Sequence, residues 1–219
     1  MSDAEMLGDN DLFADLEPVA LARVVASSRP ERLARNQVLF REGEPAVELF
    51  VVRTGRVALA KLAGDGRESM VALMGPGDVF GEMGLFDGLG RSTQARALDP
   101  ADLVAVPYAP LREALGANPA ALWALLTMLA SRLRATDESL ADSVFLDVPG
   151  RTAKRLLELA GDDGRFGATV TQEELAAMVG ASRERVNKAI ATFIRLGWLE
   201  QADRRYRILD RDRLAAYAR

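Results

Sequence analysis

Residues 118–145, NPAALWALLTMLASRLRATDESLADSVF, decide the fold of this chain of 219 residues. Leucines recur along the stretch at steps of four and three, with Thr136 in the one polar position of the stripe, which is heptad spacing. These leucines are Leu122, Leu126, Leu129, Leu133 and Leu140. Asn118 suits a helix N-cap and Pro119 suits the first helical turn. Neither proline nor glycine follows until Pro149 and Gly150, which we expect to stop the helix. The stretch therefore predicts one long, uninterrupted helix.

The predicted helix is longer than a small domain needs for its own core. At about 1.5 Å per residue it extends for roughly 40 Å. Its leucine stripe is narrow, as in a pair of helices related by a twofold axis. We therefore expect a partner helix from a second copy of the chain, that is, a homodimer. The alternative is a long helix that packs only on its own domain.

The composition limits the classes of protein to which the chain can belong. With 49% hydrophobic residues, it can bury a substantial core, and its length predicts two compact domains. Cysteine and histidine are both absent, which excludes disulfides, iron–sulfur clusters held by thiolates, haem held by histidine, the usual zinc sites and Ser-His-Asp catalysis. We expect neither an enzyme nor a metal, haem or iron–sulfur protein.

Two further features concern location and charge. No apolar run approaches the ~20 residues that span a bilayer, and the first residues, MSDAEMLGDNDLF, are acidic where a signal peptide would be basic. We expect a cytoplasmic protein with no membrane partner. From Gly150 onward the chain carries 14 Lys and Arg against 10 Asp and Glu, a net charge of +4, whereas the residues before it carry 14 against 22, a net charge of −8. The basic C-terminal part is therefore where a polyanion would bind.

The residues before the long helix change their hydrophobic period. Up to about Arg29 the apolar residues fall at helical spacings, and between Val38 and Val106 they form short bursts separated by turn signals. The bursts are VLF, ELFVV, VALAKL, SMVALM and DLVAV. Many short strands at regular spacing predict an antiparallel β-roll, and residues 109–115 predict a short helix. The expected fold class is thus α+β.

One stretch of this strand-rich region, FGEMGLFDGLGRST at residues 80–93, differs from a hairpin. It holds four glycines within ten residues, a carboxylate at Glu82, and an arginine and a serine at Arg91 and Ser92. Glycines let backbone N–H groups approach an anion, and Arg91 can donate two hydrogen bonds to phosphate oxygens. Glu82 suits a sugar hydroxyl, because a phosphate would repel it. The pattern fits a sugar-phosphate site, and it also fits a glycine-rich surface loop with a solvated arginine.

The C-terminal part has the spacing of a helix-turn-helix. Residues 171–174, TQEE, form a capping box, Gly180 makes the turn, and Ser182 caps a second helix. The outward residues that we expect on that second helix are Arg183, Glu184, Arg185, Asn187 and Lys188, which a DNA major groove can use. An ordinary solvated helix face would look similar. A small hairpin around residues 202–205 follows, whose arginines, Arg204 among them, suit phosphates.

Three motifs together resemble one family over nearly the whole chain. GEMGLF with the later RST, the string FLDVPGR at residues 145–151, and TQEELAAMVGASRERVNKAI at residues 171–190 are similar to the cyclic-AMP receptor protein (CRP/FNR) family. The spacing from Glu82 to Arg91 resembles that of the actinobacterial-type members. The resemblance implies a cyclic-nucleotide-binding β-roll at residues 1–117, a dimerisation helix at 118–146 and a winged helix-turn-helix at 147–219.

The resemblance also implies the residues of two binding sites. Those expected at a cyclic AMP effector are Gly81, Glu82, Met83, Arg91, Ser92, Arg132, Thr136 and Asp137, with Arg132 supporting Glu82 and Thr136 touching the adenine. Asp137 departs from the small neutral residue usual in the family, and a carboxylate there can accept a hydrogen bond from the amine of adenine. Those expected at DNA are Thr171, Gln172, Ser182, Arg183, Glu184, Asn187, Lys188 and Arg204.

The function implied by the resemblance is that of a homodimeric transcription regulator. It would be controlled by cyclic AMP, bind double-stranded DNA at a palindromic operator with TGTGA-like half-sites, and contact RNA polymerase. Two alternatives remain at this stage. One is a regulator of the same fold whose roll needs no ligand, with Arg91 only bracing the fold, and the other is a cyclic-nucleotide-binding adaptor whose C-terminal domain recruits protein.

Overall fold

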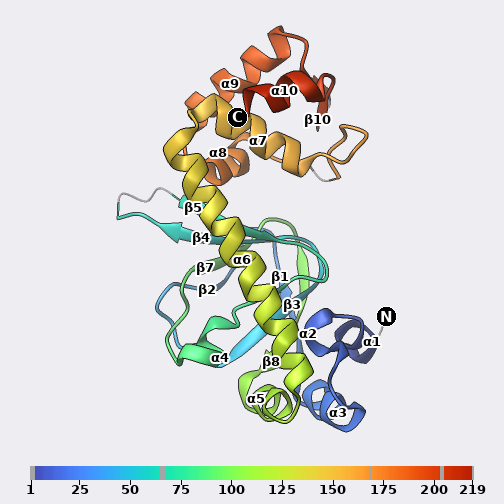
Figure 1. The fold of residues 1–219 in the computed structure, drawn as a ribbon. Coiled ribbons are helices and arrows are strands. Elements are labelled where there is room, and N and C mark those ends of the chain that lie inside the picture. Colours follow the sequence, from blue (N-terminus) through green and yellow to red (C-terminus); the bar gives the residue numbers. More distant parts are fainter. Residues whose placement is uncertain (1–2, 65–67, 168, 203–204, 219) are drawn as a thin grey trace. The chain divides into compact units, whose positions relative to one another are not determined.

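The computed structural model describes residues 3–64, 68–167, 169–202 and 205–218. Contacts divide the chain into two compact units, Met1–Leu62 with Val71–Leu133, and Ala63–Met70 with Arg134–Arg219. The elements, in chain order (Figure 1), are α1 (Asp3–Gly8), α2 (Asp11–Ala14), α3 (Pro18–Ser27), β1 (Arg29–Leu33), β2 (Val38–Phe40), β3 (Glu48–Thr54), β4 (Val57–Leu62), β5 (Glu68–Met74), β6 (Val79–Phe80), α4 (Met83–Asp87), β7 (Gln94–Ala97), β8 (Ala101–Pro107), α5 (Tyr108–Gly116), α6 (Pro119–Phe145), α7 (Val148–Leu159), α8 (Gln172–Val179), α9 (Arg183–Arg195), β9 (Leu199–Ala202), β10 (Arg205–Ile208) and α10 (Arg211–Tyr217). The expected α+β fold class is confirmed.

Two four-stranded sheets have the orders β1-β8-β3-β6 and β2-β7-β4-β5. Their strands belong to the first unit, except that β5 does so only from Val71 onward. The pairings of β1 with β8, of β3 with β6 and β8, and of β7 with β2 and β4 are antiparallel. Both sheets supply side chains to one hydrophobic cluster, in which Phe40, Phe50 and Phe80 lie with ring centroids 5.4–6.2 Å apart. The predicted β-roll is therefore built around an aromatic core between its sheets.

A second hydrophobic cluster lies on the other face of the β1-β8-β3-β6 sheet. It joins Leu49 and Val51 of β3 to the helices α1, α2, α3, α5 and the first half of α6. Successive residues of β3 thus face opposite sides, with Phe50 and Val52 in the inter-sheet core and Leu49 and Val51 under the helices. This explains why LFVV, residues 49–52, is an unbroken apolar run, because a strand covered on both faces does not alternate.

The long helix α6 has the expected N-cap. The Asn118 side chain accepts hydrogen bonds from the backbone N–H groups of Ala120 at 3.0 Å and Ala121 at 3.4 Å. One face of α6 packs on its own unit through Ala121 and Leu125, which are 0% and 2% exposed, and Leu129 is partly buried against them. Four leucines of the predicted stripe are instead 37–64% exposed; they are Leu122, Leu126, Leu133 and Leu140. Packing within the chain therefore leaves most of the stripe uncovered.

The break after α6 differs from the sequence-based expectation. Pro149 and Gly150 were expected to stop the helix, but they lie in the first turn of α7, which begins at Val148. Proline is tolerated in that turn because its missing N–H has no intrahelical partner there. Asp147 is the N-cap, and its side chain accepts a hydrogen bond from the Gly150 backbone N–H at 2.8 Å. Only Leu146 and Asp147 separate α6 from α7.

Several elements lack a clear sequence signal. The edge strand β1, RPERL, is charged and mostly exposed, and β6 and β7 are short. The helix α4 forms inside the glycine-rich stretch and ends at Gly88, which adopts the left-handed conformation at φ 69°. Among the described residues, no single helix is both long and apolar enough to cross a bilayer, and α5 with α6 meets that test only as a pair bent by 115°.

In the second unit, α7, α8, α9 and α10 pack around one hydrophobic cluster with the hairpin of β9 and β10. Thr171 and Glu174 form both hydrogen bonds of the predicted capping box, and Gly180 adopts the left-handed conformation at φ 65° between α8 and α9. Val186, Ala189, Ile190 and Phe193 bury one face of α9. The predicted helix-turn-helix is confirmed.

Candidate functional site

The glycine-rich stretch forms a compact turn between β6 and α4. Gly81 has φ 79°, and a Cβ atom on it would lie 2.6 Å from Nη1 of Arg91, so that glycine is required both for its backbone conformation and for the approach of the guanidinium. Two backbone hydrogen bonds hold Arg91 on the opposite side of this turn: its N–H donates to the Glu44 carbonyl at 2.9 Å, and its own carbonyl accepts from the Gly43 N–H at 2.8 Å. Gly81 and Arg91, ten residues apart in sequence, therefore meet.

The Arg91 side chain is buried and held on three sides. Nη1 donates to the Gly81 carbonyl at 3.0 Å and lies 3.5 Å from the Tyr108 hydroxyl. The centre of the guanidinium lies 4.2 Å from the ring centroid of Phe40 and 5.3 Å from that of Phe50, within the range of cation–π interactions. The sequence-based alternative of a solvated loop arginine is therefore wrong, because Arg91 is only 7% exposed.

Arg91 is a buried cation. Among the described residues, no Asp or Glu oxygen forms an ion pair with it, and its Nε is buried without a hydrogen-bond partner. Burial lowers the pKa of Arg91 below its usual value, and the attraction of Tyr108, Glu48 and Glu44 offsets this only in part. A buried charge is costly unless an opposite charge and hydrogen bonds compensate it. The environment is thus suited to an anion.

Glu82 lies on the same turn, is 4% exposed, and has its own partner. Its Oε1 accepts a hydrogen bond from Nη1 of Arg132 at 2.7 Å, and Arg132 also donates to the backbone carbonyl of Val79. The contact between Arg132 and Glu82 that the resemblance implied is therefore present. It connects the glycine-rich turn to α6 within the first unit.

The other residues predicted at the ligand lie in two places. Met83 and Ser92 are exposed beside the turn, and the Ser92 hydroxyl contacts the Met83 sulfur at 3.3 Å. Thr136 and Asp137 are exposed on α6 in the part that belongs to the second unit. Their contacts with a ligand remain predictions.

The first turns of α9 carry most of the predicted DNA contacts at the surface. Arg183, Glu184, Arg185 and Lys188 are all exposed. Asn187 was expected to point outward but is only half-buried at the edge of the apolar face, one residue after Val186, and its Oδ1 is buried without a partner. Arg204 lies outside the described residues, whereas Arg205 and Arg207 of the hairpin are exposed.

Two residues that were predicted to contact DNA also stabilise the ends of helices. The Thr171 hydroxyl accepts from the Glu174 N–H at 3.1 Å, and the Ser182 hydroxyl accepts from the Arg185 N–H at 3.4 Å. These bonds cap α8 and α9, so any contact of either hydroxyl with DNA would add to a capping role. Gln172 follows Thr171 and is half-buried.

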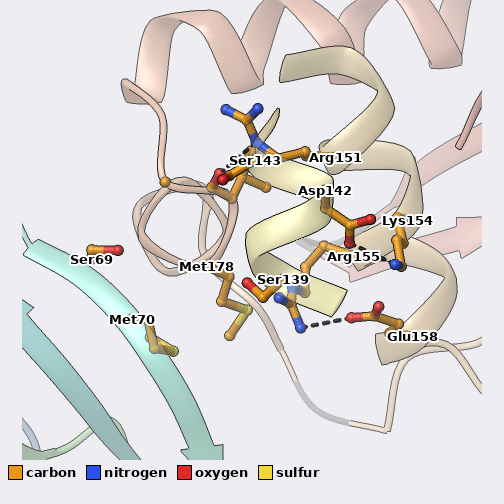
Figure 2. A pocket seen from close by; sticks show the side chains of 12 residues that line it. Ser69, Met70, Ser139, Asp142, Ser143, Arg151, Lys154, Arg155, Glu158 and Met178 are labelled. Carbon is orange, nitrogen blue, oxygen red and sulfur yellow. Dashed lines mark hydrogen bonds and ion pairs between the residues drawn. The ribbon is translucent and has the colours of Figure 1, made fainter. Parts of the chain in front are cut away.

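Charged side chains also connect the end of α6 to α7 and α8. Arg151 donates from Nη1 to the Leu146 carbonyl at 2.7 Å and from Nε to the Val179 carbonyl at 3.1 Å. Lys154 forms an ion pair with Asp142 at 2.6 Å. Figure 2 shows Arg151, Lys154 and Asp142 around a polar pocket within the second unit. One arginine thus binds the carbonyl ends of two helices.

Sequence reasoning missed Tyr108 and Arg151. Tyr108 directly follows β8, far in sequence from the glycine-rich stretch, and nothing in the local pattern links the two. Arg151 was seen only as part of the string FLDVPGR. Among the described residues, no group of three or more Asp or Glu side chains is placed to hold a metal ion.

Comparisons with known proteins agree with this architecture. The profile of the family described as Cyclic nucleotide-binding domain matches residues 30–118, and that of the Crp-like helix-turn-helix domain matches residues 150–217. The class is therefore that of proteins that join a cyclic-nucleotide-binding domain to a helix-turn-helix. Together with the relatives described next, these matches show that the chain belongs to the CRP/FNR family of transcription regulators.

One relative is the CRP-like cAMP-activated global transcriptional regulator of Mycobacterium tuberculosis strain H37Rv. It is 40% identical over 222 residues, which cover 98% of this chain and 99% of the relative. FixK2 from Bradyrhizobium japonicum is similar in structure, with a TM-score of 0.80, 25% identity, and coverage of 88% of this chain and 98% of FixK2. The c-di-GMP-responsive global regulator CLP of Xanthomonas campestris has a TM-score of 0.75, 27% identity, and coverage of 88% and 99%. The relatives are transcriptional regulators, which confirms the expectation that the chain is not an enzyme.

Proposed function

We propose that the chain is a homodimeric transcription regulator that binds cyclic AMP in the glycine-rich turn and an inverted-repeat operator through α9. The environment of Arg91 is the observation that supports the binding of cyclic AMP. Arg91 is a buried cation with no carboxylate partner among the described residues and with an unpartnered Nε, beside a glycine that admits the guanidinium. A cyclic phosphate is an anion that would compensate both the charge and the open donor.

The residues around Arg91 fit the remaining parts of such a ligand. Glu82, oriented by Arg132, would accept a hydrogen bond from a ribose hydroxyl, and Ser92 would donate to a phosphate oxygen. Thr136 and Asp137 of α6 would contact the adenine. The "cAMP-activated" description of the relative from M. tuberculosis supports cyclic AMP over other anions.

Dimerisation would use the leucine stripe of α6. Leu126, Leu133 and Leu140 are 52%, 63% and 64% exposed, although they recur at heptad spacing. Burying apolar surface contributes roughly 25 cal/mol per Å², so a second α6 packed on this stripe would stabilise the pair. We therefore assign the domain roles as predicted, with residues 1–117 binding the nucleotide, 118–146 forming the dimer and 147–219 binding DNA.

The DNA part follows from the twofold symmetry of such a dimer. Two copies of α9 would enter successive major grooves roughly 34 Å apart, which requires an inverted repeat. Arg183 and Lys188 suit guanine and Glu184 suits the amino group of cytosine. The resemblance to the family implies that the half-site would be TGTGA-like. The regulator would act in the cytoplasm and contact RNA polymerase at its promoters.

Control by the ligand requires a difference in affinity between two states. Cyclic AMP can favour DNA binding only if it binds the DNA-competent arrangement of α6 and α7 more tightly than the other. The contact of Arg132 with Glu82 and the contacts of Arg151 with Leu146 and Val179 are the polar connections that such a change would use.

A second candidate function keeps the DNA-binding domain but needs no ligand. It is favoured by the contacts that already hold Arg91, namely the Gly81 carbonyl, the Tyr108 hydroxyl and the two phenylalanine rings. In that case Arg91 would only brace the fold.

Calorimetric titration of the full chain with cyclic AMP, with and without a TGTGA-type operator duplex, tests the proposal. We expect saturable binding of one nucleotide per protomer and tighter binding when the operator is present, because the coupling is reciprocal. Cyclic GMP and c-di-GMP serve as control ligands. Absence of cyclic AMP binding together with ligand-independent, salt-sensitive operator binding would establish the second candidate instead.

A further inference from the structure

Tyr108, the first residue of α5, reaches the glycine-rich turn from the far end of β8. It is 7% exposed, and its hydroxyl donates a hydrogen bond to the Gly81 carbonyl. A Cβ atom on Gly84 would lie 3.3 Å from this hydroxyl, so Tyr108 also occupies the space next to the first turn of α4. The hydroxyl is therefore fixed against the backbone of the turn.

The same hydroxyl and carbonyl determine which part of the Arg91 guanidinium remains available. Nη1 faces the Gly81 carbonyl at 3.0 Å and the Tyr108 oxygen at 3.5 Å. The rings of Phe40 and Phe50 fix the plane of the guanidinium at 4.2 and 5.3 Å. A guanidinium can bind two oxygens through its Nη1–Nη2 edge or through its Nε–Nη2 edge. Here Nη1 is engaged, and Nε is buried without a partner.

We infer that Tyr108 is a positioning residue, which, with the Gly81 carbonyl, holds Nη1 of Arg91 so that the Nε–Nη2 edge faces the cyclic phosphate. Tyr108 does not itself touch the nucleotide in this arrangement. The inference rests on the proposed function, because it names how the same site recognises its anion.

The protonation of Tyr108 agrees with this role. Burial raises the pKa of Tyr108 above its usual value, and the nearby carboxylates Glu82, Asp87 and Glu48 raise it further, whereas Arg91 lowers it. The hydroxyl thus keeps its proton at neutral pH, so that it can donate to the Gly81 carbonyl while its oxygen faces Nη1.

The first test replaces only the hydroxyl, by Tyr108→Phe in the full chain, with cyclic AMP binding measured by calorimetry. We expect about a tenfold loss of affinity, the size of one hydrogen bond near a charged group, with the melting temperature of the unliganded protein close to that of the wild type. Tyr206→Phe is the matched control. Tyr206 is 3% exposed and lies in the second unit, so its change should leave cyclic AMP affinity as it was.

A second readout separates positioning from a general weakening of the site. The Sp and Rp phosphorothioates of cyclic AMP replace one or the other exocyclic oxygen by sulfur, a weaker acceptor. A fixed Nε–Nη2 edge should bind one diastereomer several-fold more tightly than the other. Tyr108→Phe should bring the ratio of the two affinities toward one, because the guanidinium can then rotate. A general loss of packing would weaken both diastereomers equally and leave the ratio unchanged.

The outcomes are distinguishable from failure of the proposed function. If the wild type binds no cyclic AMP, the proposed function fails. If the wild type binds it but Tyr108→Phe keeps the wild-type affinity, the inference alone is overturned. Equal affinity of the wild type for both diastereomers, or an unchanged ratio in Tyr108→Phe, would also overturn it.

Discussion

The two candidate binding regions are built in opposite ways. In the first unit, Arg91 and Glu82 are 7% and 4% exposed and are already held by groups of the protein. In the second unit, Arg183, Glu184 and Lys188 stand exposed on α9, whose other face is buried. A small anion offers few contacts, so a desolvated cation must bind it strongly, whereas a large polyanion can bind at the surface, where many weaker contacts add up.

Because the functional residues are buried in the first unit and exposed in the second, we expect mutations in the two units to change stability and binding differently. A buried charged group affects the stability of the empty protein as well as ligand binding, whereas an exposed one affects binding almost alone.

The largest expected effect is that of Arg91→Met. Loss of the charge-assisted contacts to the phosphate should weaken cyclic AMP binding by roughly 2–5 kcal/mol, the usual cost of removing one partner of a buried charge pair. The empty protein should nevertheless keep or raise its melting temperature, because a buried cation without a carboxylate is replaced by an apolar side chain of similar size. Titration calorimetry and thermal unfolding measure the two effects.

Arg183→Ala is the exposed counterpart of that variant. It should weaken operator binding and leave both cyclic AMP affinity and melting temperature unchanged.

A fall of several degrees in the melting temperature of Arg91→Met would show instead that Arg91 mainly braces the fold, as the second candidate function requires.

An intermediate effect is expected for Glu184→Ala. If Glu184 accepts a hydrogen bond from a cytosine amino group, its removal should relax the preference at one symmetric base pair by about 1–3 kcal/mol. Competition assays with single-base operator variants measure this preference. Arg204→Ala is the control, since loss of a phosphate contact should weaken all duplexes alike and lower the salt dependence. Equal weakening of every duplex by Glu184→Ala would exclude base recognition by this residue.

The smallest effect is expected for Ser182→Ala. Its hydroxyl caps α9 by accepting from the Arg185 N–H, and loss of an N-cap destabilises a helix by about 0.5–2 kcal/mol. Chemical denaturation should show that loss, with the base preference unchanged. Ser182→Asp, which retains an N-cap acceptor, should restore stability. Altered base preference in Ser182→Ala would instead mean that the hydroxyl contacts DNA.

The contrast also explains how far the sequence alone reaches. The helix-turn-helix could be predicted from its residues, because the capping box, Gly180 and the buried positions of α9 all follow from local spacing. The long helix and its cap at Asn118 were predictable for the same reason. The charged edge strand β1 could not be predicted, because its pairing with the distant strand β8, and not its own sequence pattern, makes it a strand.

The glycine-rich turn shows where local reasoning stops. Its chemistry indicated an anion site, but Arg91 also fitted a solvated loop, and only the resemblance to a family favoured the first interpretation. What makes Arg91 a buried cation comes from Phe40, Phe50 and Tyr108, which lie 51, 41 and 17 positions away in the chain. The prediction for Pro149 was wrong for a related reason. A proline that ends one helix and a proline in the first turn of the next helix look alike in the sequence, and Pro149 is of the second kind.

The two-residue break between α6 and α7 bears on how fast the proposed response to a ligand would be. Leu146 and Asp147 are the only residues outside helices there, and Arg151 holds the Leu146 carbonyl from the next helix. A rearrangement at this point needs a few backbone rotations, the exchange of the hydrogen bond from Arg151 to the Leu146 carbonyl and the separation of the ion pair between Lys154 and Asp142, with neither helix unfolding. Motions of this kind take microseconds to milliseconds. The response to a ligand would then be limited by diffusion and release of the nucleotide, not by refolding of the protein.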